Sequence, residues 1–349
     1  MSAPDPFEVS AALRTLPLFA GIPPRDVERL EHFMARFEVA AGEHLFRQGD
    51  HSGVMHLIDR GRVEVQVEGA NGLPRTLARL GPGELLGEIS LLGSDKRTAS
   101  GIASETTSGW MLFRAAFETL RLDPGAGSVE LMARIAELAV GRLRARYEAI
   151  ALEIGVEPAA SPAAAASQPP VAASPALFRP DYLHSLLCFH EFHDHAQVAA
   201  AIGGATPYEL PRGSIVTAPH VGTDELLLVL RGAVDVSVRS GGTARSVRLA
   251  GPGRFVGHVG VLDEGPGLVV AHARERVVLV PLAGERLRAM LRDPSAVARR
   301  LTAAIAEDTA RALRQAERPM ARTSLGPVAV ATAMAATCTQ SPGAAGAAR

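Results

Sequence analysis

The octapeptide LGPGELLG at residues 80–87 recurs as AGPGRFVG at residues 250–257, 170 positions further along the chain. Both stretches contain a Gly-Pro-Gly turn, then two apolar residues and a closing glycine. Turn signals between short apolar runs are typical of β-proteins. We therefore examined whether the residues on either side repeat as well.

The flanking residues extend this repeat in both directions. Glycines and an Asp-Pro pair keep the register, with one residue more on the N-terminal side: Gly42 with Gly213, Gly61 with Gly232, and Asp123-Pro124 with Asp293-Pro294. ARIAELAVGRLR at 133–144 then matches AAIAEDTARALR at 303–314. One fold therefore occurs twice.

Composition divides the chain into four parts. Residues 155–180 are rich in Ala and Pro, which predicts an extended linker because proline interrupts helices and small residues bury little surface. We predict a first domain at 10–154 (copy one), the linker at 155–180, a second domain at 181–320 (copy two) and a low-complexity tail at 321–349.

Each copy combines strand patterns with a closing helix. Runs such as RVEVQV at 62–67 alternate β-branched and polar residues between glycine-containing turns, which predicts a small antiparallel β-barrel or jelly roll. Apolar residues then recur at spacings of three and four over 128–152. The predicted class is mainly β with flanking helices. The apolar helix face would serve as a homodimer seam or pack on its own barrel.

Charge and cysteine content exclude several classes of protein. Lys plus Arg is 36 and Asp plus Glu is 37, so bulk electrostatics favours neither nucleic acid nor anionic membrane. The two cysteines exclude a disulfide framework. The N-terminus lacks the pattern of a signal peptide and no long apolar stretch spans a membrane, so we expect a cytoplasmic protein. The single lysine and single asparagine indicate the codon bias of a GC-rich bacterial genome.

The residues with ligand-binding chemistry lie in LGEISLLGSDKRTASGIAS at 86–104. Gly87 permits a tight bend, after which residues 88–92 can form a helical turn with free N–H groups that attract an anion. Arg97 follows across a loop at 93–96, at the start of a predicted strand over 97–104, and its guanidinium suits the same anion. Glu88 would be repelled by an anion, so its carboxylate fits a hydroxyl donor on the ligand.

This segment resembles the cyclic nucleotide-binding domains, whose pattern it matches at Gly87, Glu88, Ile89, Leu91, Leu92, Arg97 and Ala99. It departs from that pattern at Leu86, Ser90 and Lys96, none of which removes a ligand contact. The resemblance implies two tandem barrels of the double-stranded β-helix type, each closed by a C-terminal helix.

The same resemblance implies a ligand and the residues that bind it. The ligand would be cyclic AMP or cyclic GMP, with no other cofactor. Glu88 would hold the ribose hydroxyl, Arg97 the cyclic phosphate, and the N–H groups of residues 88–90 the other phosphate oxygens. The implied ligand-binding set is Gly87, Glu88, Ile89, Ser90, Arg97, Thr98 and Ala99. A residue of the closing helix would cap the base, with Arg142, Leu143 and Arg146 as candidates.

Three alternatives remain open at this stage. Glu88 and Arg97 would form a structural ion pair if no ligand is bound. In copy two His258 and Gly267 replace them, which predicts that copy two binds no cyclic nucleotide, although His258 with His220 or His272 would suit another anion or a pH response. Finally, the cluster His190, Glu191, His193, Asp194 and His195 has ligands for zinc, but the repeat register places it at solvent-facing turns, and we predict no metal.

These observations predict a cytoplasmic sensor that binds a cyclic mononucleotide and changes its contacts with a protein partner or between its domains. About thirty residues follow the second helix, too few for a helix-turn-helix domain, so DNA is not an expected partner. We also expect no enzyme, because no catalytic motif appears. The alternative is a scaffold protein in which both barrels bind other proteins and no nucleotide acts.

Overall fold

The strands of copy one form two antiparallel four-stranded sheets, with orders β1-β8-β3-β6 and β2-β7-β4-β5. The computed structural model describes residues 12–51, 53–68, 73–93, 96–154, 171–172, 179–218, 224–240, 243–263 and 269–317. The strands are β1 (Met34–Val39), β2 (His44–Phe46), β3 (Val54–Arg60), β4 (Val63–Glu68), β5 (Pro74–Leu80), β6 (Leu85–Leu86), β7 (Ser100–Ala103) and β8 (Thr107–Phe113).

Helices surround this barrel on one side. They are the 3-10 turn η1 (Pro17–Phe19), α2 (Pro24–Glu31), α3 (Glu88–Gly93), α4 (Arg114–Leu122) and α5 (Ala126–Glu153). The core between sheets and helices includes Leu57, Trp110 and Phe117, each no more than 2% exposed. Burying such side chains supplies the main driving force for this packing.

Copy two repeats the arrangement. Its strands are β10 (Tyr208–Leu210), β11 (Ile215–Thr217), β12 (Glu225–Arg231), β13 (Val234–Ser240), β14 (Thr243–Ala250), β15 (Phe255–Val256), β16 (Val269–Ala273) and β17 (Val277–Ala283). Its helices are α6 (Pro180–His184), η3 (Leu187–Phe189), α7 (His195–Ile202), α8 (His258–Leu262), α9 (Gly284–Leu291) and α10 (Ala296–Glu317). The predicted fold class is confirmed.

A repeated glycine shows why the two sequences keep the same register. Gly61 connects β3 to β4 with φ +88°, and a Cβ there would lie 2.4 Å from the Thr106 carbonyl oxygen. Gly232 connects β12 to β13 with φ +82° and would meet the Arg276 carbonyl oxygen at 2.4 Å. Both the backbone conformation and the close approach require glycine.

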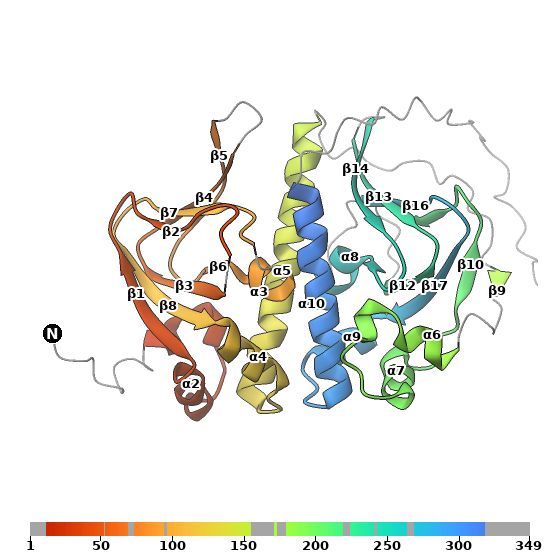
Figure 1. Ribbon diagram of the computed structural model, residues 1–349, viewed down its shortest axis with the longest axis horizontal. Helices are drawn as coiled ribbons and strands as arrows, with labels where there is room; N and C mark the ends of the chain where they lie inside the picture. Colours follow the sequence, from red (N-terminus) through yellow and green to blue (C-terminus); the bar gives the residue numbers. More distant parts are fainter. Residues whose placement is uncertain are drawn as a thin grey trace, which may run out of the picture.

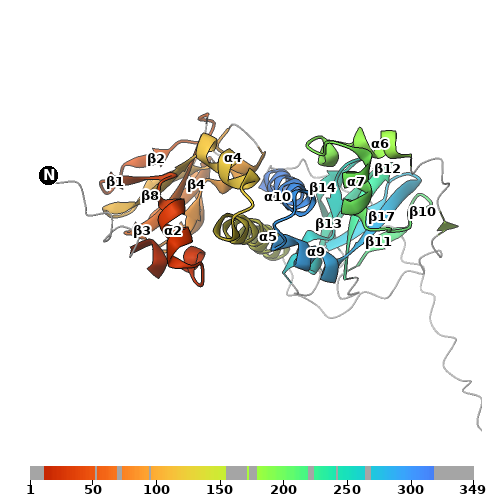
Figure 2. The same cartoon turned by 90° about the horizontal axis from the view of Figure 1, so that it is seen from below.

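The long helices α5 and α10 lie side by side at the centre of the molecule, with one barrel on either side (Figures 1 and 2). They run in the same direction, because Arg299 near the start of α10 contacts the carbonyl before α5, and Arg146 near the end of α5 contacts Ala316 at the end of α10. The face of 128–152 that we expected to form a homodimer seam or to pack on its own barrel is therefore covered within the chain by α10.

Most of the predicted linker and tail lies outside the described residues. Of the linker, residues 171–172 form β9 (Val171–Ala172), which pairs with β10 at the edge of copy two. The tail at 321–349 is not described. Among the helices that are described, none has the length and hydropathy needed to cross a bilayer.

Candidate ligand-binding site

Gly87 joins β6 to α3 in a conformation that only glycine adopts easily. Its φ is +91°, and a Cβ at this position would lie 1.9 Å from Nη1 of Arg97 and 3.2 Å from the Val54 carbonyl oxygen. The missing side chain therefore lets the Arg97 guanidinium lie directly against the start of α3.

Arg97 is buried without a carboxylate partner. Its side chain donates to the carbonyl oxygens of Val54 at 2.6 Å and Gly87 at 3.3 Å, and its guanidinium carbon lies 3.7 Å from the centre of the Phe46 ring. The residue is 5% exposed, and no carboxylate of the described residues makes an ion pair with it. Burial lowers the pKa of Arg97 to about 10, although the nearby charges of Glu88 and Asp50 act in the opposite direction. Buried cations are rare without a counter-ion, so this arrangement favours an anion.

Glu88 is fully buried and contacts α5 rather than Arg97. One carboxylate oxygen accepts a hydrogen bond from Arg142, which also donates to the Leu85 carbonyl oxygen. The other oxygen, Oε2, has no hydrogen-bond partner among the described residues. The alternative of a structural Glu88–Arg97 ion pair is not what the structure shows. Arg142, a candidate to cap the base, instead joins the closing helix to the carboxylate.

The remaining predicted ligand residues surround the same turn. The Ser90 hydroxyl lies 3.4 Å from the Lys96 carbonyl oxygen, and Ala99 is buried. The Ile89 carbonyl oxygen accepts from Arg314 at 3.2 Å, and Thr98 hydrogen-bonds Glu317; both of these partners belong to α10 of copy two. All seven predicted residues therefore lie on α3, at its start or on the segment facing it. The strand expected from residue 97 begins only at Ser100.

Sequence reasoning did not find several neighbours of this site. His56 on β3 is 6% exposed and lies edge-on to Phe37, with ring centres 5.1 Å apart. Burial and the Arg97 charge lower the pKa of His56 to about 3, so the ring is neutral. Arg314 and Glu317 come from the other copy, and only the alignment of Arg314 with Arg144 in the repeat signals such a role.

In copy two the equivalent position holds a different cluster. His258 begins α8 and is 3% exposed, with Nε2 3.2 Å from Oδ2 of Asp308. Arg248 of β14 contacts the same oxygen at 2.6 Å. His258 thus faces a carboxylate, and His272 lies on β16, whereas Gly267 and His220 lie outside the described residues.

The histidine-rich segment of copy two makes local contacts. Glu191 forms an ion pair with Arg121 of copy one, Asp194 accepts from the N–H of Gln197 at 2.8 Å to cap α7, and His193 lies 2.6 Å from Arg300. Within the described ranges, no three His, Cys, Asp or Glu side chains come close enough to hold a metal ion.

Comparison with known proteins identifies copy one. Residues 36–123 match the family model of the cyclic nucleotide-binding domain. The chain is 41% identical over 98 residues to the cyclic AMP receptor protein of Thermus thermophilus, covering 28% of this chain and 45% of that protein. It is 36% identical over 148 residues to the acetyltransferase Pat of Mycolicibacterium smegmatis, covering 42% and 43%. The chain thus spans less than half of the length of either relative.

Among solved structures, the regulatory domain of Toxoplasma gondii PKA, crystallised with cAMP, is 16% identical. The match covers 83% of this chain and 96% of that one, with a TM-score of 0.31.

The relation to Pat overturns one expectation. We excluded an enzyme because no catalytic motif appears, yet the similar stretch occurs in a protein named an acetyltransferase. A solved structure of a cAMP-binding acyltransferase from Mycobacterium smegmatis is also 33% identical, over 40% of this chain and 42% of that one, with a TM-score of 0.32. The missing motif was therefore the wrong ground for excluding enzymes, because domains of this type also occur in them.

Proposed function

We propose that copy one, which belongs to the cyclic nucleotide-binding domain family, binds a cyclic mononucleotide, cyclic AMP or cyclic GMP, and reports it to copy two. The ligand-binding residues of this proposal are Gly87, Glu88, Ile89, Ser90, Arg97, Thr98 and Ala99. In it, Arg97 holds the cyclic phosphate, and Oε2 of Glu88 accepts a hydrogen bond from the ribose hydroxyl.

The observation that carries the proposal is the buried guanidinium of Arg97. It contacts two carbonyl oxygens and an aromatic ring, so its positive charge has no ion-pair partner within the described residues. A cyclic phosphate beside it would supply the missing negative charge through charge-assisted hydrogen bonds, each contributing about 1.5–3 kcal/mol. The unpartnered Oε2 of Glu88 adds an acceptor for a neutral hydroxyl at the same site.

The contacts of α5 and α10 support a change between the domains when ligand binds. Arg142 joins Glu88 to α5, so a ligand hydroxyl that approaches Glu88 also affects the helix. Arg314 of α10 contacts the carbonyl oxygens of Ile89 and Gly93 at both ends of α3. A ligand that shifts α3 would therefore change the packing of both central helices, which is a shift between two packed states.

Calorimetric titration with cyclic AMP and cyclic GMP tests the proposal. We expect one nucleotide per chain, and Arg97→Gln, which removes the charge at similar size, should weaken binding about a hundredfold, equivalent to about 2.7 kcal/mol. Arg97→Lys tests whether charge alone suffices. Arg79→Gln is the matched control, because Arg79 is 75% exposed on β5. Wild type that binds neither nucleotide below millimolar concentration would refute the proposal and favour the scaffold alternative.

A further inference from the structure

The end of α10 lies against the ligand site of the other copy. Arg314 donates to the carbonyl oxygens of Ile89 at 3.2 Å and Gly93 at 2.8 Å. One helical turn further along, Glu317 accepts a hydrogen bond from the hydroxyl of Thr98. Copy two therefore contributes two charged side chains to the surroundings of α3 and Arg97.

Glu317 keeps one buried oxygen without a partner. Its Oε2 is inaccessible to solvent and makes no hydrogen bond with any described residue. Burial raises the pKa of Glu317, the Thr98 hydrogen bond and the Arg146 charge lower it, and the Glu88 charge raises it further. Oε2 of Glu88 is unpartnered in the same way, so each copy offers one free carboxylate oxygen at this site. Buried acceptors without a donor cost free energy, and a ligand with two donors would relieve both.

Residues of copy two alone fix the position of α10. Oδ2 of Asp308 accepts from Nη2 of Arg248 at 2.6 Å and from the Phe255 N–H at 2.9 Å, and lies 3.2 Å from Nε2 of His258. These four residues, the Asp308 cluster, are each at most 3% exposed. Since they come from β14, β15, α8 and α10, the cluster attaches the helix to its own barrel without a ligand.

Copy one attaches its helix with the charges reversed. There the helix supplies the cation, Arg142, and the barrel supplies the carboxylate, Glu88. The repeat aligns Leu85, whose carbonyl oxygen accepts from Arg142, with Phe255, whose N–H donates to Asp308. The contact in copy one leaves an oxygen of Glu88 free, whereas the one in copy two gives the carboxylate three donors on a single oxygen.

Building on the proposed function, we propose that copy two completes the ligand site of copy one. Glu317 is a ligand-contacting residue whose free oxygen accepts a hydrogen bond from the exocyclic amino group of the purine. Asp308 is a positioning residue that holds α10 on its own barrel so that Glu317 reaches the ligand. Thr98 orients the Glu317 carboxylate from the side of copy one.

The chemistry of the acceptor selects the probe. An ionised carboxylate only accepts hydrogen bonds, and the amino groups of adenine and guanine donate them. A purine riboside 3′,5′-cyclic monophosphate without the amino group keeps the phosphate and the ribose but has no donor for Glu317. Wild type should therefore bind cyclic AMP about tenfold more tightly than this analogue.

Glu317→Ala tests the contact directly. The variant should lose about tenfold in affinity for cyclic AMP and little for the analogue, so that the ratio between the two ligands falls close to one. Glu307→Ala on the same helix is the matched control and should keep the wild-type ratio. An unchanged ratio in Glu317→Ala, with wild type still binding cyclic AMP, overturns this inference alone. Failure of wild type to bind either ligand overturns the proposed function as well.

Asp308→Asn tests the positioning role. The amide loses the charge that holds Arg248, so the end of α10 should exchange its amide protons faster and the ligand ratio should fall, although residue 308 does not touch the ligand. A merely structural role would lower the melting temperature and leave the ratio unchanged, which would overturn the assignment. Arg248→Lys, which keeps the charge but changes the contact, decides the question by the same ratio if Asp308→Asn does not fold.

Discussion

Arg144 and Arg314 lie 170 residues apart and make the same contact in opposite directions. Arg144 of α5 donates to the Val259 carbonyl oxygen in α8 of copy two, and Arg314 of α10 donates to the Ile89 carbonyl oxygen in α3 of copy one. Val259 and Ile89 are themselves 170 residues apart. Each closing helix therefore contacts the ligand-site turn of the other copy, and the two domains are related by an approximate two-fold exchange (Figure 2).

This symmetry predicts unequal effects of two equivalent substitutions. Arg144→Ala and Arg314→Ala should each lower the free energy of unfolding by about 1–2 kcal/mol, because each leaves carbonyl oxygens without their donor. Only Arg314→Ala should also weaken cyclic nucleotide binding severalfold, since only α3 borders Arg97. Urea unfolding and calorimetry on both variants measure this. Equal loss of affinity in Arg144→Ala would contradict the assignment of the site to copy one.

Gly87 and Gly42 separate backbone strain from close approach. Both have positive φ, +91° and +85°, but a Cβ at Gly42 meets nothing within 4 Å, whereas at Gly87 it meets the Arg97 guanidinium. Gly42→Ala should therefore cost about 1 kcal/mol of stability from strain alone and leave ligand affinity unchanged. Gly87→Ala should cost more and lower the affinity at least tenfold, because Arg97 must move. Equal affinities in the two variants would show that Arg97 does not depend on Gly87.

The ion pair between Arg121 and Glu191 predicts the response to metal. Oε1 of Glu191 lies 2.8 Å from Nη2 of Arg121 on the other copy, and the Arg121 hydrogen bonds lower the pKa of Glu191 despite its partial burial. Since this carboxylate is already paired, neither zinc nor a chelator should shift the melting temperature. Glu191→Gln should lower it through the lost contact between copies. Stabilisation by zinc in wild type that His193→Ala abolishes would instead establish the metal site.

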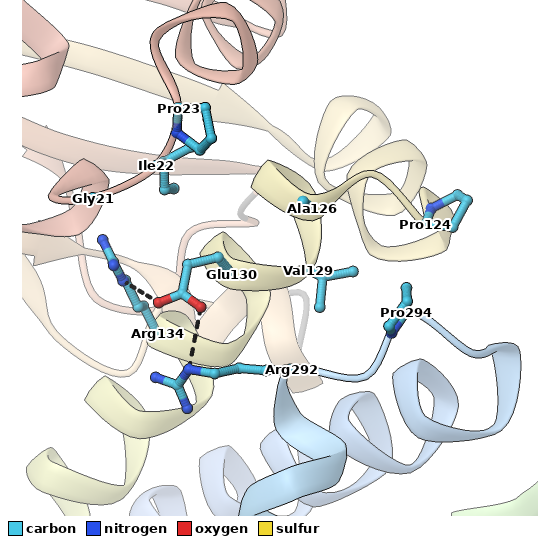
Figure 3. Close-up of a pocket in the computed structure, with 10 residues that line it drawn as sticks. All are labelled: Gly21, Ile22, Pro23, Pro124, Ala126, Val129, Glu130, Arg134, Arg292 and Pro294. Atoms are coloured by element: carbon cyan, nitrogen blue, oxygen red, sulfur yellow. Dashed lines mark hydrogen bonds and ion pairs between the residues drawn. The ribbon is translucent and has the colours of Figure 1, made fainter.

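The cavity beneath the two copies shows how domains can meet without a binding site. About 390 Å³ of space lies between the start of α5 and the loop before α10 (Figure 3). Glu130 there accepts from Arg134 at 2.8 Å and lies 3.2 Å from Arg292 of copy two. The carboxylate pairs with both guanidinium groups, so these contacts join the copies and leave no uncompensated charge for a ligand.

The repeat predicted the architecture because its glycines and apolar positions report local geometry. Gly61, Gly87 and the apolar face of 128–152 each need one residue type for a reason that the chain shows locally. The residues around 88 and 97 were brought together as predicted for the same reason, since a tight turn joins them.

Contacts between the copies were not predictable in this way. Glu317 meets Thr98 only because two helices pair across domains, and no local pattern encodes that pairing. One signal was present: Asp308 stands where the apolar face of copy one has Leu138. A carboxylate at an otherwise apolar position requires a buried partner, and a search for that partner would have pointed to Arg248.

His56 predicts how the stability of copy one depends on pH. Its pKa is about 3 in the folded protein, lowered by burial and by the Arg97 charge, against about 6.5 in an unfolded chain. Below pH 6.5 the unfolded state therefore binds a proton that the folded state refuses. Stability is lost as pH falls from about 6.5 towards 3, at up to about 1.4 kcal/mol per pH unit for this one group.

His56→Leu should remove that contribution, because the leucine binds no proton in either state. The free energy of unfolding, measured in urea between pH 7 and pH 4, should fall less steeply in the variant than in wild type. His32→Leu, at an exposed position on the other side of the barrel's helices, should keep the wild-type slope. Bound cyclic nucleotide should raise the pKa of His56, because a phosphate beside Arg97 offsets the positive charge that disfavours a second cation. Parallel slopes for wild type and His56→Leu would mean that the ring is protonated in the folded state as readily as in the unfolded one.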